Sequence, residues 1–207
     1  MQTRDYKKSA PGGFFHIYNR GNARENIFLD DEDFAFFLLR LRQNLAPDKS
    51  VGRYFRPLPT NSFELIAYCL MPNHFHLLIK QGGDIPTSKL LGKLCTSYAI
   101  YFNRKYDRVG HIFQDQFKQI QVDSNKYLTW LSAYIHNNPV MAGLTEHPED
   151  WRWSSYQEYV DSQKKIMPIK SEIVLGQYKS PLEYKEFVES VLLVQHDNIS
   201  SDLLLDP

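Results

Sequence analysis

The sequence predicts an α+β fold of the ferredoxin-like type, an antiparallel sheet with helices on one face, followed by a helical C-terminal appendage. The 207 residues are 43% hydrophobic and 23% charged, close to the average of globular proteins, which excludes a collagen-like, coiled-coil or wholly disordered chain. The hydrophobic period alternates between that of strands and that of helices. These segments follow in the order strand, helix, strand, strand, helix, strand, which is the split βαβ order.

Each element has a local signal. The first expected strand is aromatic and β-branched and lies between glycines, and Asp30 or Asp31 offers an N-cap to the first helix. Residues 46–60 are rich in proline and charge and read as a loop. Asp123 or Ser124 caps the last helix, which Pro139 should stop near residue 137. We expect strands at 14–18, 63–70, 74–80 and 117–122, and helices at 31–45, 87–105 and 125–137.

The expected domain spans residues 1–160, with a small helical extension over 161–207. In the split βαβ arrangement the two helices cover one face of the sheet, so we expect the other face to stay free for function. The aromatic segment 151–156 should pack back on the core, because so many aromatic side chains are costly to expose.

The charge is unevenly distributed along the chain. Residues 1–145 hold 18 Lys and Arg against 12 Asp and Glu, a net charge of +6, and residues 146–207 carry −6. A basic body with an acidic tail is typical of a core that binds a polyanion, although chance asymmetry gives the same pattern.

The sequence also predicts where in the cell the protein is found. No apolar run reaches the roughly 18 residues of a membrane span, and the segment before Gly12 has no apolar stretch of the secretory kind. The two cysteines lie in apolar segments instead of a paired framework. We expect a cytoplasmic protein, associated with the nucleoid if its partner is DNA, and no membrane partner.

Two histidines flank one apolar residue in the strand expected at 74–80. Alternation puts His74 and His76 on one face, about 6 to 7 Å apart along the chain, a span that one metal ion can bridge. The tripeptide alone also fits two surface histidines, but Phe75, Leu77 and Ile79 would point to the helix-covered side.

A phenol and an amide share one face of the last helix. Tyr134 and Asn138 are four residues apart, at helical spacing. Spacing alone also fits a core aromatic at Tyr134 and a helix terminator at Asn138 before Pro139. His136 points away from that face.

Five ordered motifs within about residues 12–160 resemble the single-tyrosine HUH transposases, the IS200-like family, and within it the REP-associated tyrosine transposase branch. The first three motifs are Asn19-Arg20-Gly21-Asn22, Met71-Pro72-Asn73-His74-Phe75-His76 and the segment 110–117, and the last two are the segments 134–143 and 153–156. Residues beyond 163 lie outside this resemblance.

The resemblance implies a nuclease and strand transferase that binds single-stranded hairpin DNA of the repetitive palindromic type. It implies that Tyr134 is the nucleophile, forming a 5′-phosphotyrosine, and that His74 and His76 bind Mg²⁺ or Mn²⁺, with Asn138 as a third ligand. Relatives include monomers and homodimers, so both states stay open. Basic residues interleaved with aromatic ones suit phosphate contacts and base stacking, and the candidates for DNA binding are Arg20, Arg24, Lys89, Lys93, Tyr98, Arg104, Lys105, Arg108 and Lys118.

Two alternatives stay open. One is a non-catalytic nucleic-acid-binding module of the same fold, with Phe14, His16, Tyr18 and Phe75 as a stacking platform on the open sheet. The other is a replication initiator or relaxase with the same metal chemistry, which the small size and the lack of a helicase region disfavour.

Overall fold

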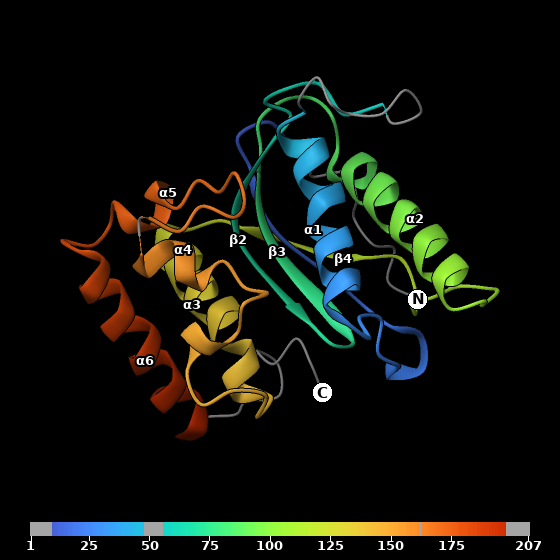
Figure 1. Ribbon diagram of the computed structural model, residues 1–207. Coiled ribbons are helices and arrows are strands. Elements are labelled where there is room, and N and C mark those ends of the chain that lie inside the picture. The colour runs from blue at the N-terminus through green and yellow to red at the C-terminus, as the bar shows by residue number, and fades with distance from the viewer. Residues whose placement is uncertain (1–9, 48–55, 162, 198–207) are drawn as a thin grey trace, which may run out of the picture.

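The computed structural model describes residues 10–47, 56–161 and 163–197. A four-stranded antiparallel sheet runs through its centre in the order β2-β3-β1-β4, which is the ferredoxin-like order, so the predicted fold class is confirmed (Figure 1). The strands are β1 (Phe14–Arg20), β2 (Phe63–Met71), β3 (His74–Gln81) and β4 (Lys118–Val122). The helices are α1 (Asp31–Leu45), α2 (Thr87–Lys105), α3 (Asn125–Met141), α4 (Tyr156–Val160), α5 (Glu172–Leu175) and α6 (Pro181–Asp197), and the short 3₁₀ turns are η2 (Asn22–Arg24) and η3 (Pro148–Asp150).

Local sequence signals set the helix starts. The Asp30 side chain accepts hydrogen bonds from the backbone N–H groups of Glu32 and Asp33, and the Asp33 carboxylate bonds back to the backbone of Asp30, which makes a capping box. Ser124 caps α3 by accepting from the N–H of Tyr127. Both predicted N-caps are confirmed.

The helices lie on both faces of the sheet (Figure 1). On one face α1 and α2 enclose a cluster that includes Phe37, Phe75 and Tyr98. On the other face α3 and α6 enclose a second cluster, which includes Leu78, Leu131 and Tyr184. The expectation that this second face stays free is wrong, because α3 needs a partner for its apolar side and the sheet supplies it.

The end of α3 also differs from the prediction. The helix runs through Pro139 to Met141, and does not stop near residue 137. Proline removes one backbone donor, but the following turn stays bonded: the N–H of Ala142 donates to the carbonyl of Asn138, and that of Leu144 to the carbonyl of Pro139. Packing between the sheet and α6 therefore outweighs the local stop signal.

The segment 151–156 packs along the free edge of β2, as its aromatic content predicts. The indole N–H of Trp151 donates to the carbonyl of Leu70 at 2.8 Å, and the N–H of Ser155 to the carbonyl of Tyr68 at 3.0 Å. Trp153 and Tyr156 are buried. The segment thus satisfies the backbone groups of an edge strand that would otherwise be open to pairing.

The C-terminal part of the described chain packs against α3. Tyr184 and Val188 of α6 belong to the same buried cluster as Leu131, and both their side chains are fully enclosed. No helix within the described ranges has the length and apolar character to cross a membrane. The last ten residues of the expected extension, 198–207, lie outside the described residues.

Candidate metal and nucleophile site

Two imidazoles lie on the α3 face of β3. His74 and His76 alternate with Phe75 and Leu77, whose side chains join the cluster under α1 and α2. The ring centroids of the two histidines are 4.9 Å apart, and the ring planes are perpendicular at 89°. The shared face that the alternation predicts is therefore present in the fold.

Helix α3 brings a phenol and an amide to these imidazoles. The ring centroid of Tyr134 lies 6.0 Å from that of His76. One turn later, Asn138 lies near both imidazoles, since its side chain acts to raise the pKa of His74 and of His76 against the larger effect of burial, and its Nδ2 donates to the carbonyl of Tyr134 at 2.9 Å. Four side chains from two distant stretches of the sequence thus converge on one point.

The tautomer of His74 follows from its neighbour. Its Nδ1 lies 2.6 Å from Oδ1 of Asn73, and an amide oxygen only accepts, so Nδ1 carries the proton. The Nδ2 of the same amide donates to the carbonyl of Arg24, which fixes the orientation of the amide. Nε2 of His74 therefore keeps the lone pair that a metal ion needs.

His76 is held in a comparable way by a residue on β1. Its Nδ1 lies 2.9 Å from Nε2 of His16, and the two rings are stacked with centroids 5.1 Å apart. In the tautomer in which His76 donates from Nδ1, its Nε2 also keeps a lone pair. His16 is then the group that orients the second imidazole.

The donor set fits a divalent cation. Burial, with a smaller contribution from the charge of Arg20, lowers the pKa of His74 to about 4. The pKa of His76 lies well below 6.5, mainly because of burial, so both rings are neutral at neutral pH, the form that binds metal. Among the described residues no three His, Cys, Asp or Glu side chains are placed to share an ion, so the third donor would be the amide oxygen of Asn138. Imidazole and amide ligands are compatible with Mn²⁺ and Mg²⁺.

The site is closed. Tyr134 is 1% exposed, His76 is fully buried and His74 is 9% exposed. The ring of Tyr134 is also stacked on Trp130, with centroids 5.5 Å apart, and Trp130 is stacked in turn on Tyr127. A polymer can reach the phenol only if this part of the molecule opens.

Two of the predicted DNA contacts lie on this face of the sheet. Arg20 is paired with His74 in the register of β1 and β3, and Lys118 is paired with Tyr18 across β1 and β4. The ammonium of Lys118 lies 5.5 Å from the centroid of the Tyr18 ring. Arg24 follows in η2 and is exposed.

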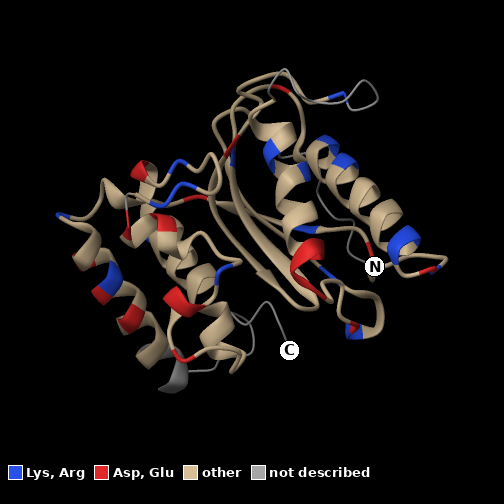
Figure 2. Ribbon diagram, viewed as in Figure 1, with Lys and Arg blue, Asp and Glu red and all other residues tan. Residues whose placement is uncertain are grey.

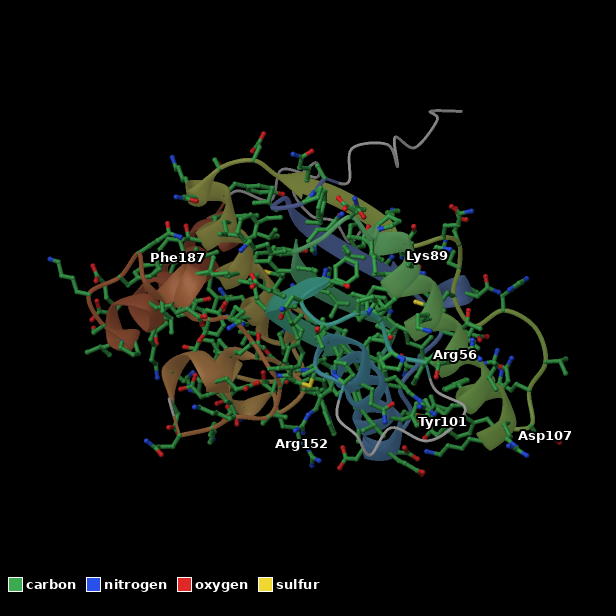
Figure 3. The ribbon with its side chains drawn as sticks, turned by 90° about the horizontal axis from the view of Figure 1, so that it is seen from above. Arg56, Lys89, Tyr101, Asp107, Arg152 and Phe187 are labelled. Atoms are coloured by element: carbon green, nitrogen blue, oxygen red, sulfur yellow. The ribbon has the colours of Figure 1, made fainter. Side chains whose placement is uncertain are left out.

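The other predicted contacts lie on the opposite side of the molecule, along α2 and just after it. Figure 2 shows basic residues along α2, on the far side of the sheet from α3 and α6. In Figure 3 the label of Lys89 lies on the α2 side and that of Phe187, of α6, on the other. The residues concerned are Lys89, Lys93, Tyr98, Arg104, Lys105 and Arg108. The structure therefore does not bring them to Tyr134.

The prediction that Tyr98 stacks on bases is wrong. Its side chain is fully buried, its ring packs against Phe37 and Phe102, and its hydroxyl donates to the carbonyl of Ile27. The helical spacing that makes α2 amphipathic puts Tyr98 on the core side of that helix.

Two of the predicted basic contacts already have acidic partners. The Lys105 ammonium lies within 3.1 Å of carboxylate oxygens of Asp30, Glu32 and Asp33, and so ties the end of α2 to the start of α1. Arg108 lies 3.1 Å from Glu25 in an exposed pair. An exposed pair contributes little stability and exchanges readily with a phosphate, whereas the partly buried Lys105 is committed to the fold.

A groove of about 1030 Å³ opens between α1 and α2. Figure 3 labels Arg56 and Tyr101 on its lining. Phe36 and Tyr101 are stacked at 3.9 Å beside it. Its basic lining residues are Arg40, Arg56, Lys93, Arg104 and Lys105, against the single acidic residue Glu32. The basic residues therefore outnumber the acidic ones along this groove.

Sequence reasoning missed two functional neighbours. From the sequence, His16 is expected only as part of a stacking platform, although alternation along residues 14–20 puts it on the same face as Tyr18 and Arg20. The platform itself does not exist as an open surface, because His16 and Phe75 are fully buried. The role of Asn73 in fixing the His74 tautomer has no periodic signal, since it depends on the turn between β2 and β3.

Known proteins resemble this chain in sequence and in structure. The family model described as "Transposase IS200 like" matches residues 55–138. A "Putative REP-associated tyrosine transposase" of Haemophilus influenzae is 29% identical over 113 residues, which are 49% of this chain and 63% of the relative. The chain thus matches less than two thirds of the length of that relative.

One solved structure resembles the described fold over most of its length. It is a REP-associated tyrosine transposase bound to a REP hairpin, with a TM-score of 0.58 and 18% identity, covering 77% of this chain and 85% of the other. At this identity the likeness shows a shared fold. The two sequence matches confirm the resemblance to the IS200-like transposases and to a REP-associated relative, and the solved structure adds that the fold is shared.

Proposed function

Because residues 55–138 match the family of the IS200-like transposases, we propose that this protein cleaves and rejoins single-stranded DNA through Tyr134. The observation that carries the proposal is the convergence of His74, His76, Tyr134 and Asn138. The names of the relatives support a substrate that forms a hairpin of the repetitive palindromic type.

The proposed reaction is a transesterification at a phosphodiester. The phenol oxygen of Tyr134 forms a bond to phosphorus while the bond to the 3′-oxygen breaks, and the phenolic proton ends on the leaving 3′-hydroxyl. The product is a 5′-phosphotyrosine and a free 3′-hydroxyl. Because one ester replaces another, the reverse attack rejoins strands without a nucleotide cofactor.

Each residue of the site has a separate role in the proposed reaction. A phenol has a pKa near 10 and attacks poorly at neutral pH, so positioning must supply much of the rate. Stacking on Trp130 and contact with His76 hold the ring of Tyr134 in place. His74, His76 and Asn138 would hold Mg²⁺ or Mn²⁺, which when bound polarises the scissile phosphate.

The DNA would touch the protein in two places. The groove between α1 and α2 offers a basic surface with stacked aromatic rings at its side, which suits phosphates and unpaired bases. Arg20 and Lys118 lie instead on the face of Tyr134. A hairpin held at the groove could thus present a different part of the same strand to the phenol once the site opens.

A covalent-adduct assay tests the proposal. The full chain is incubated with Mn²⁺ and a library of 3′-labelled hairpin oligonucleotides that carry unpaired flanks of random sequence. Because the protein would stay on the 5′ phosphate of the downstream piece, the 3′ label should move with the protein on a denaturing gel. Tyr134→Phe should abolish this band and leave hairpin binding nearly unchanged.

The matched control is Tyr127→Phe, two turns earlier on α3, where a tyrosine is stacked on the other side of Trp130. This variant should keep the band. If Tyr134→Phe gives as much adduct as the unaltered chain, the proposal is refuted. Binding that needs no metal and is never followed by cleavage would favour a non-catalytic module.

A further inference from the structure

Arg20 occupies a defined position beside the candidate site. It is the last residue of β1 and is paired with His74 in the register with β3. Residues directly opposite on neighbouring antiparallel strands have Cβ atoms about 5 Å apart and point to the same face. The Arg20 side chain therefore leaves the sheet on the side of His74, His76 and Tyr134.

The backbone at Arg20 is fixed. Its carbonyl accepts from the N–H of Gln114 at 2.9 Å, and its N–H donates to the side chain of Asn19 at 2.9 Å. The next residue, Gly21, donates to the carbonyl of Asn73 at 2.7 Å. A Cβ on Gly21 would lie 2.1 Å from the carbonyl oxygen of Glu25, so only glycine fits there. The chain thus delivers the guanidinium from a rigid part of the sheet.

The charge of Arg20 acts on the other groups of the site. It helps to lower the pKa of both His74 and His76, which stay neutral. Burial and Arg24 lower the pKa of Arg20, whereas the phenols of Tyr134 and Tyr18 raise it, and a guanidinium stays charged throughout. A positive charge on the same face as two imidazoles that would bind metal gives this part of the site a positive potential, which attracts a phosphate.

We propose that the Arg20 guanidinium binds a non-bridging oxygen of the phosphate that Tyr134 attacks and stabilises the charge that develops there. This inference rests on the proposed function and makes Arg20 a catalytic residue of that reaction. The planar guanidinium suits this task, because it offers two parallel N–H donors to a phosphate. A general phosphate contact elsewhere on the DNA would affect affinity more than rate.

The test combines variants with a neutral substrate. Arg20→Gln is compared with the unaltered chain on the cleavable oligonucleotide and on the same oligonucleotide with a methylphosphonate, which carries no charge, at the scissile position. On the phosphate, adduct formation at saturating DNA should fall about 100- to 1000-fold, the usual effect of losing one oxyanion donor. On the methylphosphonate the same substitution should cost less than about tenfold, because the transition state on that substrate carries one negative charge fewer.

Two further variants control the test. Arg152→Gln removes an exposed arginine that is ion-paired with Asp31, and it should keep the full rate on both substrates. Arg20→Lys keeps the charge but loses the paired donors, so its rate should lie between those of the unaltered chain and Arg20→Gln. An equal rate loss for Arg20→Gln on both substrates, or no loss at all, would overturn the proposal. If Arg20→Gln does not fold, a full rate for Arg20→Lys on the phosphate substrate would contradict the paired-donor role.

A binding readout separates this proposal from the function itself. In a Tyr134→Phe background, which cannot form the adduct, the affinity for the phosphate should exceed that for the methylphosphonate about tenfold, and Arg20→Gln should remove the difference. If the unaltered chain forms no adduct with any DNA, the function fails. The affinity difference still decides whether Arg20 binds that phosphate.

Discussion

The buried imidazole of His136 should make the stability of the fold depend on pH. His136 is fully buried on the side of α3 that faces α6. Its Nδ1 lies 2.8 Å from the hydroxyl of Tyr184, and its Nε2 lies 2.8 Å from that of Ser155. Burial lowers the pKa of His136 from 6.5 to about 3. The perturbation is His136→Gln, which keeps a donor and an acceptor but cannot take up a proton.

The sign and size follow from proton linkage. Below pH 6.5 the unfolded chain binds a proton at His136 that the folded chain does not bind, so the free energy of unfolding falls as the pH drops from 6.5 toward 3. Above pH 6.5 this contribution is absent. At 1.36 kcal/mol per pH unit, about 2 kcal/mol should be lost between pH 6.5 and pH 5 through this residue alone.

Urea unfolding at pH 7.5 and pH 5.0, followed by tryptophan fluorescence, measures this. At pH 7.5 the variant should be less stable by about 1 to 3 kcal/mol, because the glutamine does not reproduce both hydrogen bonds. Between pH 7.5 and pH 5.0 the free energy of unfolding of the variant should rise by about 2 kcal/mol relative to that of the unaltered chain, because only the unaltered chain loses stability through His136. The other buried histidines are present in both chains, so their contributions cancel in this difference. A gap that is the same at both pH values would refute the reasoning.

Two other predictions concern residues on opposite faces of the sheet. His16→Phe keeps the stacked ring but removes the hydrogen bond to Nδ1 of His76, so Mn²⁺ affinity, measured from free Mn²⁺ by electron paramagnetic resonance, should fall about 10- to 100-fold, and His16→Gln should retain more of it. Equal Mn²⁺ affinity of the unaltered chain, His16→Phe and His16→Gln would contradict the orienting role of His16. Tyr98→Phe leaves the buried carbonyl of Ile27 without its donor and should cost about 1 to 3 kcal/mol in urea unfolding, with no change in DNA affinity by gel shift. If the folded variant lost DNA affinity, Tyr98 would have to contact DNA after all.

Local sequence signals predicted the strands and the helix starts because those features are local. The capping box at Asp30 and the alternation around His74 and His76 depend on residues a few positions apart. The shared face of Tyr134 and Asn138 follows from helical spacing in the same way. What α3 packs against is not local. Its surface is buried nearly all round, which is typical of a helix enclosed between two layers.

The separation of most predicted DNA contacts from Tyr134 has a similar cause. The sequence shows that α2 carries basic and aromatic residues, but the face of the sheet that α2 covers depends on the topology. Leu94, Tyr98 and Phe102 are spaced four apart, and this spacing already puts Tyr98 on the buried side of the helix. Pro139 is the reverse case, in which a strong local stop signal is overridden by tertiary packing.

The most direct test of the account is to identify the residue that becomes linked to DNA. After reaction with hairpin DNA and Mn²⁺, digestion with trypsin and a nuclease should leave a nucleotide on the fragment 127–152, which has no internal Lys or Arg and contains both Tyr127 and Tyr134. Fragmentation by tandem mass spectrometry should place the phosphodiester on Tyr134. A nucleotide on Tyr127, or on any other of the 13 tyrosines, would contradict the account.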